Sequence, residues 1–344
     1  MQQSSTLITG GAGFIGSNLA DSLASHGRAV TVLDNLSRYG SQKNLAWLRA
    51  RHGEEVRFID ADVRDAAALR RAVEGHQVIY HLAGQTAVTT SIIDPRQDLE
   101  VNVLGTFNAL EAARLVGEDP IFIYTSTNKV YGAMDDVTVV ERNERYEYDN
   151  LPSGVSESRP LDFHSPYGCS KGAADQYVRD YARIYGLRTV VFRQSCIYGP
   201  RQMGVEDQGW VAWFVIAAIT GRPITIYGDG RQLRDVLHVD DLVRAFEFAT
   251  DHIDATKGQV YNIGGGPENT LAIWSEFGPL LSDLLGSTIE PSTYAGWRAG
   301  DQRVFVSDIR KAEREFGWRP QIKVKDGISG LVQWVQANRD LFIE

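Results

Sequence analysis

A glycine-rich stretch at residues 7–16, LITGGAGFIG, constrains the fold of this chain more than any other feature. An apolar run leads into it and an amphipathic run, residues 17–26, follows it, which predicts a strand, a tight loop and a helix. In this interpretation Gly10 permits the turn, Gly13 lets the backbone approach a phosphate, and Gly16 lets the helix pack on the strand. The free N–H groups and the dipole of the helix then favour a pyrophosphate. The spacing, G-x-x-G-x-x-G, is by itself also compatible with a turn used only for packing.

A second apolar run, residues 29–33, ends at Asp34, an acid about twenty positions beyond the loop. In dinucleotide-binding folds an acid at this position hydrogen-bonds the ribose hydroxyls of the adenosine. Its carboxylate would repel a 2′-phosphate, so the pattern favours NAD over NADP. Arg38 lies close enough to argue for NADP, but Asp34 holds the end of the strand. We therefore expect NAD as the cofactor.

The chain has 344 residues, of which 43% are apolar, which is ample for a core and long for one domain. We expect an NAD-binding domain over residues 1–200, to which a segment at about 235–265 returns, and a substrate domain over 201–344. The net charge of −9 argues against a nucleic-acid partner. Two cysteines suit neither a disulfide framework nor a metal site, so no metal is expected. With no leader and no long apolar run, we expect no membrane partner and a cytoplasmic location.

Apolar runs and helical patterns alternate through the first 200 residues. The alternation predicts an α/β fold: a Rossmann-type doubly wound parallel sheet with helices on both faces, followed by a smaller mixed α/β part. Because ligands bind at the carboxyl ends of parallel strands, the residues after each strand are the candidates for a site. The expected strands cover residues 29–33, 56–61, 78–82, 121–125, 189–192, 224–227 and 260–263, and the expected helices cover 66–74, 95–116, 167–185, 240–250, 270–285, 308–316 and 325–337.

Two stretches depart from this alternation. Residues 133–160 are polar, acidic and poorly periodic, and we expect a long insertion loop that can cover the site. Residues 208–221 are rich in aromatic side chains, and the half of the chain that they open has no glycine-rich turn of its own. We therefore expect that half to bind the substrate.

Thr127, Tyr167 and Lys171 form the sharpest group of chemically active side chains. Tyr167 and Lys171 stand four residues apart on an expected helix, so they share a face. A phenol has an ordinary pKa of about 10, and a nearby ammonium and a bound NAD⁺ would lower that pKa. The pair can then take a proton from an alcohol whose hydroxyl is hydrogen-bonded by Thr127. A Tyr-x-x-x-Lys pair alone is commonly structural, and the nucleotide loop upstream is what favours catalysis.

These motifs together resemble the extended short-chain dehydrogenase/reductase superfamily, and within it the NAD-dependent sugar-nucleotide epimerases and dehydratases. The resemblance spans essentially the whole chain. A long run at residues 161–177, and shorter runs at 34–38, 126–132, 207–211 and 301–306, are similar to 2-epimerases of CDP-linked sugars. The superfamily motifs are residues 9–16, 81–84, Asn102, 125–132, 167–171, 198–200 and 234–241.

The resemblance implies an isomerase that holds NAD tightly and recycles it within each turnover. The implied reaction is transient oxidation at C2 to a 2-keto intermediate and re-reduction on the opposite face, of the CDP-paratose to CDP-tyvelose type. The implied partner is a nucleotide-diphosphate sugar, with a CDP-sugar favoured and a UDP-sugar as the alternative. Dehydratases of the superfamily carry Asp and Glu after the catalytic Thr, whereas this chain has Asn128 and Lys129, so dehydration is not expected.

Other functions stay open at this point. A UDP-hexose 4-epimerase or a UDP-glucuronate decarboxylase of the same superfamily would use the same Tyr–Lys pair. Cys196 stands where related epimerases often have an Asn that contacts the nucleotide, which affects the choice of base and sugar. A non-catalytic NAD-binding regulator is the alternative from another class, and proteins of that kind typically lose the Tyr–Lys pair.

The resemblance also implies an oligomer. Residues 99–116 and 177–185 carry apolar side chains around more than one face. In the superfamily these helices pair across a two-fold interface, and two-fold dimers are the commonest assembly. We therefore expect a homodimer or a homotetramer.

The site residues that the resemblance implies fall into three groups. Arg234 and Arg303 are expected to pair with the substrate diphosphate, because a guanidinium matches phosphate oxygens at two points. Trp210, Phe214 and Tyr227 could bracket the pyrimidine and the sugar, although Trp and Tyr at such spacing are as often part of a core. The catalytic group is Thr127, Tyr167 and Lys171; the cofactor group is Gly10, Gly13, Phe14, Ile15, Gly16, Asp34, Asn35, Ser37, Arg38, Asp62, Val63, Leu82, Ala83, Gly84, Gln85, Asn102, Thr125, Tyr167, Lys171 and Ser195; the substrate group is Thr89, Asn128, Lys129, His164, Gln194, Gln208, Trp210, Val211, Tyr227, Gln232, Arg234 and Arg303.

Overall fold

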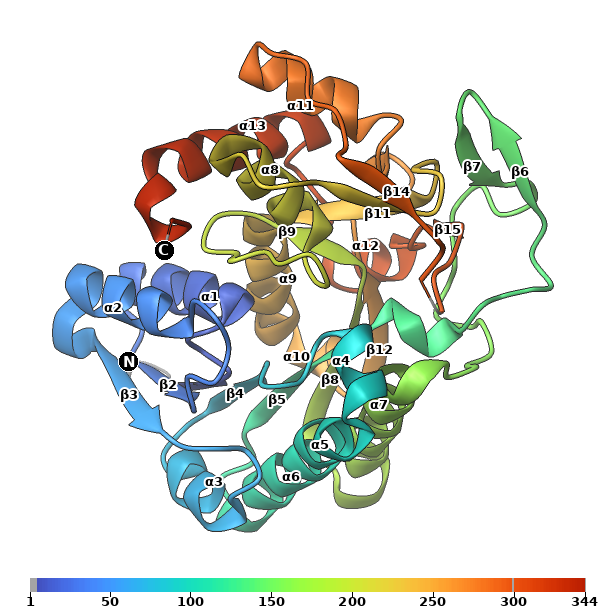
Figure 1. The fold of residues 1–344 in the computed structure, drawn as a ribbon. Helices are drawn as coiled ribbons and strands as arrows, with labels where there is room; N and C mark the ends of the chain where they lie inside the picture. Colours follow the sequence, from blue (N-terminus) through green and yellow to red (C-terminus); the bar gives the residue numbers. More distant parts are fainter. Residues whose placement is uncertain (1–4, 299, 344) are drawn as a thin grey trace.

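A computed structural model describes residues 5–298 and 300–343, and its centre is a seven-stranded parallel sheet (Figure 1). The strand order is β12-β8-β5-β4-β1-β2-β3, so the chain starts in the sheet interior at β1 and winds outwards in both directions. The expected Rossmann-type fold is confirmed. The strands are β1 (Thr6–Thr9), β2 (Val30–Asp34), β3 (Val56–Asp60), β4 (Val78–His81), β5 (Ile121–Thr127), β8 (Arg188–Gln194) and β12 (Gln259–Ile263).

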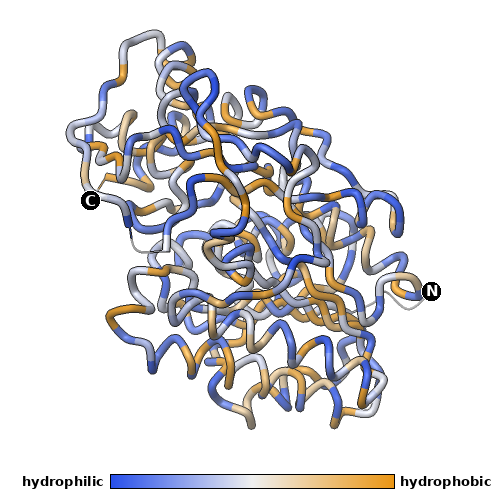
Figure 2. Tube along the Cα trace, turned by 90° about the vertical axis from the view of Figure 1, so that its right-hand side faces the viewer, coloured by the Kyte–Doolittle hydropathy of each residue, from blue (hydrophilic) through white to orange (hydrophobic). Residues whose placement is uncertain are grey.

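Helices cover both faces of this sheet, because successive residues of a strand point to opposite faces. Ile8 and Tyr80 pack against one group of helices, whereas their neighbours Leu7 and Ile79 pack against the other. The strands between the two helix layers are largely hydrophobic (Figure 2). No helix in the described ranges is both long and apolar enough to cross a membrane. The first group contains α1 (Phe14–Ser25), α2 (Ser41–His52), α9 (Val239–Asp251) and α12 (Arg310–Phe316), and the second contains α3 (Ala66–Val73), α6 (Gly105–Val116) and α7 (Ser165–Tyr185).

The second half of the chain adds a smaller mixed α/β region with its own core, which includes Phe214, Phe277 and Leu331 (Figure 1). A four-stranded sheet joins β13, β11 and β15, with β9 paired to β11, and β10 pairs with β14. Strand β12 joins the large sheet and lies within residues 235–265, the segment expected to return to the NAD-binding domain. The domain boundary at residue 200 stays a prediction. The elements are β9 (Cys196–Tyr198), α8 (Trp210–Thr220), β10 (Thr225–Tyr227), β11 (Leu233–His238), α10 (Ile253–Thr256), β13 (Thr270–Ala272), α11 (Phe277–Leu285), β14 (Thr293–Ala295), β15 (Val304–Phe305) and α13 (Val324–Ala337).

The helix expected over residues 270–285 is shorter than predicted. Residues 270–272 form β13, because they pair antiparallel with β11, and α11 begins only at Phe277. The apolar spacing of this stretch is compatible with either state, and the pairing partner decides between them.

The helix expected over residues 95–116 is interrupted. It begins as α5 (Pro95–Leu99), passes through a π-helical segment, Glu100–Leu104, and continues as α6. At this segment Asn102 turns its amide to the loop after β4, where it donates to the Gln85 carbonyl at 3.1 Å and accepts from the Gln85 N–H at 2.9 Å. A π-bulge adds one residue to a helical turn, which the apolar spacing does not reveal.

The expected insertion loop at residues 133–160 holds a β-hairpin, so the prediction of a plain loop is wrong there. Strand β6 (Val139–Arg142) pairs antiparallel with β7 (Arg145–Tyr148). The turn residues Asn143 and Glu144 both have positive φ, 51° and 61°. Positive φ at both positions matches the turn whose twist suits a hairpin, and Asn tolerates that conformation better than most residues.

Trp318 ties the segment after α12 to α9: its side chain is fully buried and its Nε1 donates to the Asp241 carbonyl at 2.9 Å. Trp318→Ala removes this bond and leaves a large cavity, so we expect the free energy of unfolding to fall by about 3–5 kcal/mol. Urea denaturation measures the loss. Phe248→Ala, at a side chain 37% exposed, is the control and should cost under about 1 kcal/mol. Equal losses in the two variants would contradict this role of Trp318.

Candidate functional site

A cavity of about 810 Å³ opens at the carboxyl ends of the sheet strands. The loops after β1, β2, β4, β5 and β8 line one side, and α8 with residues 298, 300 and 301 lines the other. This is the edge at which a doubly wound sheet binds its ligands. The cavity is of the size found for small-molecule and cofactor sites.

The glycine loop forms one wall, and it needs glycine for space. A Cβ at Gly10, whose φ is +69°, would lie 2.7 Å from the backbone of Ala83. A Cβ at Gly16 would lie 2.4 Å from the Gly10 carbonyl oxygen. Gly13 is the N-cap of α1 and offers no side-chain cap, so the first N–H groups of the helix stay available to an anion. The cradle therefore fits a pyrophosphate.

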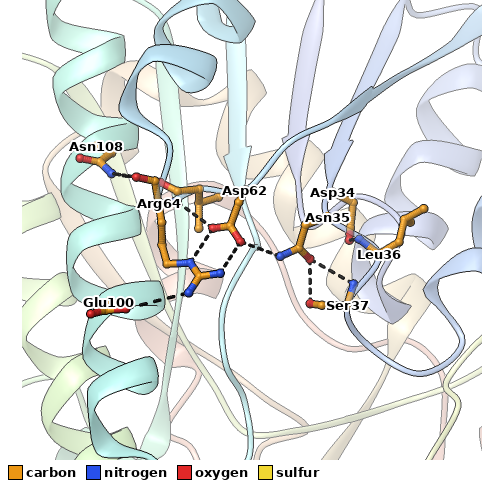
Figure 3. A network of polar contacts seen from close by, with 9 residues as sticks. Asp34, Asn35, Leu36, Ser37, Asp62, Arg64, Glu100 and Asn108 are labelled. Atoms are coloured by element: carbon orange, nitrogen blue, oxygen red, sulfur yellow. Dashed lines mark hydrogen bonds and ion pairs between the residues drawn. The ribbon is translucent and has the colours of Figure 1, made fainter.

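Polar residues after β2 and β3 continue this wall (Figure 3). The Asp34 carboxylate accepts from two backbone N–H groups, at 3.1 and 2.8 Å, and burial raises its pKa. Asn35 donates to Asp62 at 2.8 Å. Arg64 forms a two-point pair with Asp62 and holds the pKa of that carboxyl at about 2. This wall presents carboxylate and amide oxygens, the acceptors that ribose hydroxyls require.

The three residues expected to do chemistry lie at one wall of the cavity. Thr127 ends β5, and Tyr167 and Lys171 lie one turn apart on α7. The Tyr167 backbone N–H donates to the Ser91 hydroxyl at 3.1 Å, which fixes the start of the helix. The Lys171 Nζ lies 4.3 Å from the centroid of the Tyr124 ring, within range of a cation–π contact.

Burial shifts the pKa values of Tyr167 and Lys171. It raises the pKa of Tyr167 to about 12, an effect that the neighbouring Thr127 hydroxyl opposes. It lowers the pKa of Lys171 to about 7. The expected lowering of the phenol pKa by Lys171 is therefore absent in the protein alone, because burial raises the pKa of Tyr167 and drives Lys171 towards its neutral form. A positive charge brought by bound NAD⁺ would act on the phenol in the direction opposite to burial.

Cationic side chains gather at the other end of the cavity. Arg234 is buried and donates to the Asp301 carboxylate at 2.6 Å. Lys129 donates to the Gly300 carbonyl at 3.3 Å, and burial followed by repulsion from Arg234 lowers its pKa. The wall also carries Arg298, Glu206 and Asp207, so its cations and carboxylates balance. An anionic substrate group would have to compete with these carboxylates for the guanidinium groups.

Arg298 is a cavity residue that the sequence analysis missed. Its guanidinium carbon lies 3.8 Å from the centroid of the Tyr227 ring, and its Nη2 donates to the Glu206 carbonyl at 3.0 Å. The sequence signal was an arginine three residues before Asp301, and in the structure the Asp301 N–H donates to the Arg298 carbonyl at 3.2 Å. Arg303, which was expected to pair with the substrate diphosphate, lies two residues after Asp301.

Four predicted site residues do not line the cavity. His164 lies outside it, 46% exposed, and pairs with a neighbouring carboxylate. Gln232 is fully buried and donates to the Tyr227 carbonyl. Arg303 is exposed and stacks on two aromatic rings, and Asn102 lies behind the loop after β4. The described insertion at 133–160 lines no part of the cavity, so it does not cover the site as expected.

The remaining predicted residues do line the cavity. Every expected cofactor residue except Asn102 is on its wall. The expected substrate residues found there are Thr89, Asn128, Lys129, Gln194, Gln208, Trp210, Val211, Tyr227 and Arg234.

The fold and the cavity place the chain among enzymes that act through a bound dinucleotide. Residues 6–264 match the model of the NAD dependent epimerase/dehydratase family. The chain belongs to this family, and NAD is its cofactor.

Relatives within the family carry out several reactions. The chain is 45% identical over 338 residues to CDP-paratose 2-epimerase of Salmonella typhi, which covers 96% of this chain and 99% of the relative. It is 35% identical to UDP-glucose 4-epimerase of Mycolicibacterium smegmatis, with 96% and 97% covered. Among solved structures, a DesIV double mutant, a dTDP-glucose 4,6-dehydratase from Streptomyces venezuelae with NAD and DAU bound, matches with a TM-score of 0.83 at 33% identity, covering 97% and 98%.

The crowding at Gly16 predicts a specific loss of cofactor. In Gly16→Ala the new Cβ collides with the Gly10 carbonyl oxygen, so the cradle must open, and we expect the NAD retained on purification to fall at least about tenfold. The NAD content is measured after denaturation by absorbance and mass. Gly330→Ala is the control, because a Cβ at Gly330 in α13 meets no atom within 4 Å. Full NAD content in Gly16→Ala would contradict this assignment.

Proposed function

We propose that the protein is a nucleotide-sugar epimerase that inverts C2 of a CDP-linked 3,6-dideoxyhexose, interconverting CDP-paratose and CDP-tyvelose. The 45% identity to CDP-paratose 2-epimerase along the whole chain supports the substrate and the reacting carbon. The competing reaction within the family is dehydration, which needs an acid to expel a hydroxyl group.

The observation that carries epimerisation is the pair of residues after Thr127. Asn128 carries an amide, which is not an acid, and Lys129 directs its ammonium to the Gly300 carbonyl. The carboxylates that line the cavity lie elsewhere, on the loops after β2 and β3 and on the far wall at Glu206, Asp207 and Asp301. A site of this composition can move a proton on and off one hydroxyl group but is poorly equipped to remove water.

The proposed proton transfers use the wall formed by β5 and α7. Tyr167 takes the proton from the C2 hydroxyl as a base and later returns it as an acid, while Lys171 stabilises the phenolate. Thr127 hydrogen-bonds the same oxygen and fixes its position. NAD, which the glycine cradle and Asp34 would hold, would supply reversible hydride transfer at the sugar carbon, and release on the opposite face would invert it. The alcohol thus becomes a ketone and then an alcohol of inverted configuration, with no net redox change.

The sugar must turn over between the two transfers while the rest of the substrate stays bound. We assign the diphosphate to Arg234 and Arg298, with Lys129 nearby, because guanidinium groups hold phosphate oxygens at two points. Arg234 is paired with Asp301 in this structure, so a diphosphate would compete with that carboxylate. Arg303, exposed and outside the cavity, has no part in this assignment.

We assign NAD to the part of the cavity formed by the loops after β1, β2, β3 and β4. The supporting observation is the glycine cradle together with the carboxylates of Asp34 and Asp62. Cys196 also lines the cavity, at the position where the resemblance expects an Asn, so the base is assigned from the 45% relative rather than from this residue. The cytoplasmic location stays a prediction.

The reaction is tested with CDP-paratose and, separately, UDP-glucose, by following the configuration at C2 and C4 by NMR. We expect inversion at C2 of the CDP-sugar. Tyr167→Phe should lower the rate by about 10²–10⁴-fold, because the phenol is the base, and should leave bound NAD unchanged. Tyr294→Phe, at an exposed ring, is the matched control.

Two outcomes would replace this proposal. Inversion at C4 of UDP-glucose without turnover of CDP-paratose would assign the chain to the UDP-hexose 4-epimerases. Retained NAD with no turnover of either sugar would point to a decarboxylase or to a non-catalytic regulator. Undiminished turnover in Tyr167→Phe would remove Tyr167 from the mechanism.

We also propose that two copies of the chain pair through α6 and α7. Phe107 and Leu115 on α6 and Tyr177 and Ile184 on α7 are 39–66% exposed. The rings of Phe107 and Tyr177 meet edge to face at 6.2 Å, so the apolar surface is continuous across the two helices. Contiguous exposed apolar surface on a folded domain is typical of an interface.

Phe107→Lys places a charge in the middle of this surface, and we expect it to halve the mass of the native particle. Light scattering on a sizing column measures the mass. Ile343→Lys, at an apolar side chain 53% exposed near the C-terminus, should leave the mass unchanged. A native protein that already runs as a monomer would overturn the proposal.

A further inference from the structure

Asp98 is a buried carboxylate in α5 to which the mechanism above gives no role. Its side chain is fully buried. Its Oδ1 accepts from the side-chain amides of Gln85 at 3.0 Å and Asn102 at 3.1 Å. Its Oδ2 is buried and has no hydrogen-bond partner among the residues that the structure describes. A carboxylate in such a place is costly unless a positive charge nearby compensates it.

Burial raises the pKa of Asp98, and the charge of Lys171 is among the effects that oppose this shift. The Asn102 amide that holds Asp98 also donates to the Ser170 hydroxyl at 3.0 Å, and Ser170 precedes Lys171 on α7. A Cβ built on Gly84 would lie 2.9 Å from the Asn102 Oδ1 and 3.8 Å from the Lys171 Nζ, so both side chains rest on the same glycine. The side chains of Asn102 and Ser170 therefore stand between the Asp98 carboxylate and the Lys171 ammonium.

Other acids near Lys171 are already neutralised. Asp175, four residues further along α7, forms a two-point pair with the buried Arg193 at 2.9 and 3.0 Å. Asp98 has only neutral hydrogen-bond partners. Burial lowers the pKa of Lys171 to about 7, and Asp98 heads the groups that raise it again. The same charge adds to the burial that raises the pKa of Tyr167.

We infer that Asp98 is a positioning residue for the epimerase reaction: its unpaired carboxylate is the counter-charge that keeps the Lys171 ammonium charged beside Tyr167. This inference rests on the proposed function, because it gives Lys171 a role only if Tyr167 acts as a base. Asp98 touches neither the cavity nor a reacting atom, and it acts through space across Asn102 and Ser170.

A charge at Asp98 affects how the activity depends on pH. Activity needs a phenolate at Tyr167 and an ammonium at Lys171, so it rises through the first deprotonation of the pair and falls through the second. A buried negative charge disfavours deprotonation of both groups, so removing it lowers both pKa values. The whole pH profile should therefore move to lower pH. The charged and titratable groups that face the pair are His81 from β4, Tyr124 from β5, Asp98 from α5, Asp175 from α7 and Arg38 from the loop after β2.

The first test is the pH profile of kcat for the NAD-loaded enzyme in Asp98→Asn, which keeps the shape of the side chain and removes its charge. We expect both limbs to shift down by about one pH unit, which is about a tenfold loss of rate on the alkaline limb. Asp98→Glu, which keeps the charge, should show the same pH profile as the native enzyme. Asp180→Asn, at an exposed carboxylate on α7, is the control and should leave that profile unchanged.

A second measurement requires no substrate. The absorbance of a phenolate near 295 nm, taken as the difference between native protein and Tyr167→Phe, follows the titration of Tyr167 in the NAD-loaded protein. Its midpoint should fall by about one pH unit in Asp98→Asn. If Asp98→Asn does not fold, as judged by its thermal transition and NAD content, Asp98→Ser provides a second neutral variant for both measurements.

The outcomes separate this inference from the proposed function. A lower rate in Asp98→Asn with an unchanged pH profile and an unchanged titration midpoint of Tyr167 would overturn the inference. Asp98 would then only fix the positions of Gln85 and Asn102. Equal shifts in Asp98→Glu and Asp98→Asn would also overturn it. A native protein that turns over no nucleotide sugar would remove the proposed function, while the phenol midpoint would still report whether Asp98 sets the charge of the pair.

Discussion

The loops after β1 and β4 approach so closely that no side chain fits between them. The backbone at Gly10, after β1, packs directly against the backbone of Ala83, after β4. At Gly16 the first turn of α1 packs against the Gly10 carbonyl. This contact brings a helix N-terminus with free N–H groups to the rim of the cavity. It also places the loop after β4 against Asn102 and Lys171, so the glycine loop and the wall that carries Tyr167 and Lys171 share the same backbone contact.

The second constraint is the cost of burying ionisable groups. Tyr167 and Lys171 are held where water cannot stabilise either charge, so each is driven towards its neutral form. The pair becomes competent only when other charges compensate for the lost water. The cationic nicotinamide ring would favour the phenolate from the cavity side, and Asp98 would favour the ammonium from behind. With the cofactor present a larger fraction of Tyr167 would be deprotonated and available as a base, and without it Tyr167 stays a neutral phenol.

Much of this arrangement could be predicted from the sequence, because it depends on local patterns. The strand, glycine loop and helix at residues 6–25, the acid at Asp34 and the shared face of Tyr167 and Lys171 each follow from short-range spacing. The short strands β9, β11, β13 and β15 could not, because strands of two to six residues carry little periodicity and form through distant partners. Arg298 and Arg303 stand five residues apart beside a glycine turn, and only the path of the chain shows which one reaches the cavity.

The central claim, that one hydrogen leaves C2 of the sugar and returns to the same carbon, is tested most directly by isotope retention. CDP-paratose carrying deuterium at C2 is incubated with the enzyme in ordinary water, and the CDP-tyvelose formed is examined by NMR and mass spectrometry. Transfer through a bound cofactor predicts that the deuterium stays at C2 of the product. Replacement of the deuterium by hydrogen from the solvent would contradict it, because the proton would then have left as an acid from carbon.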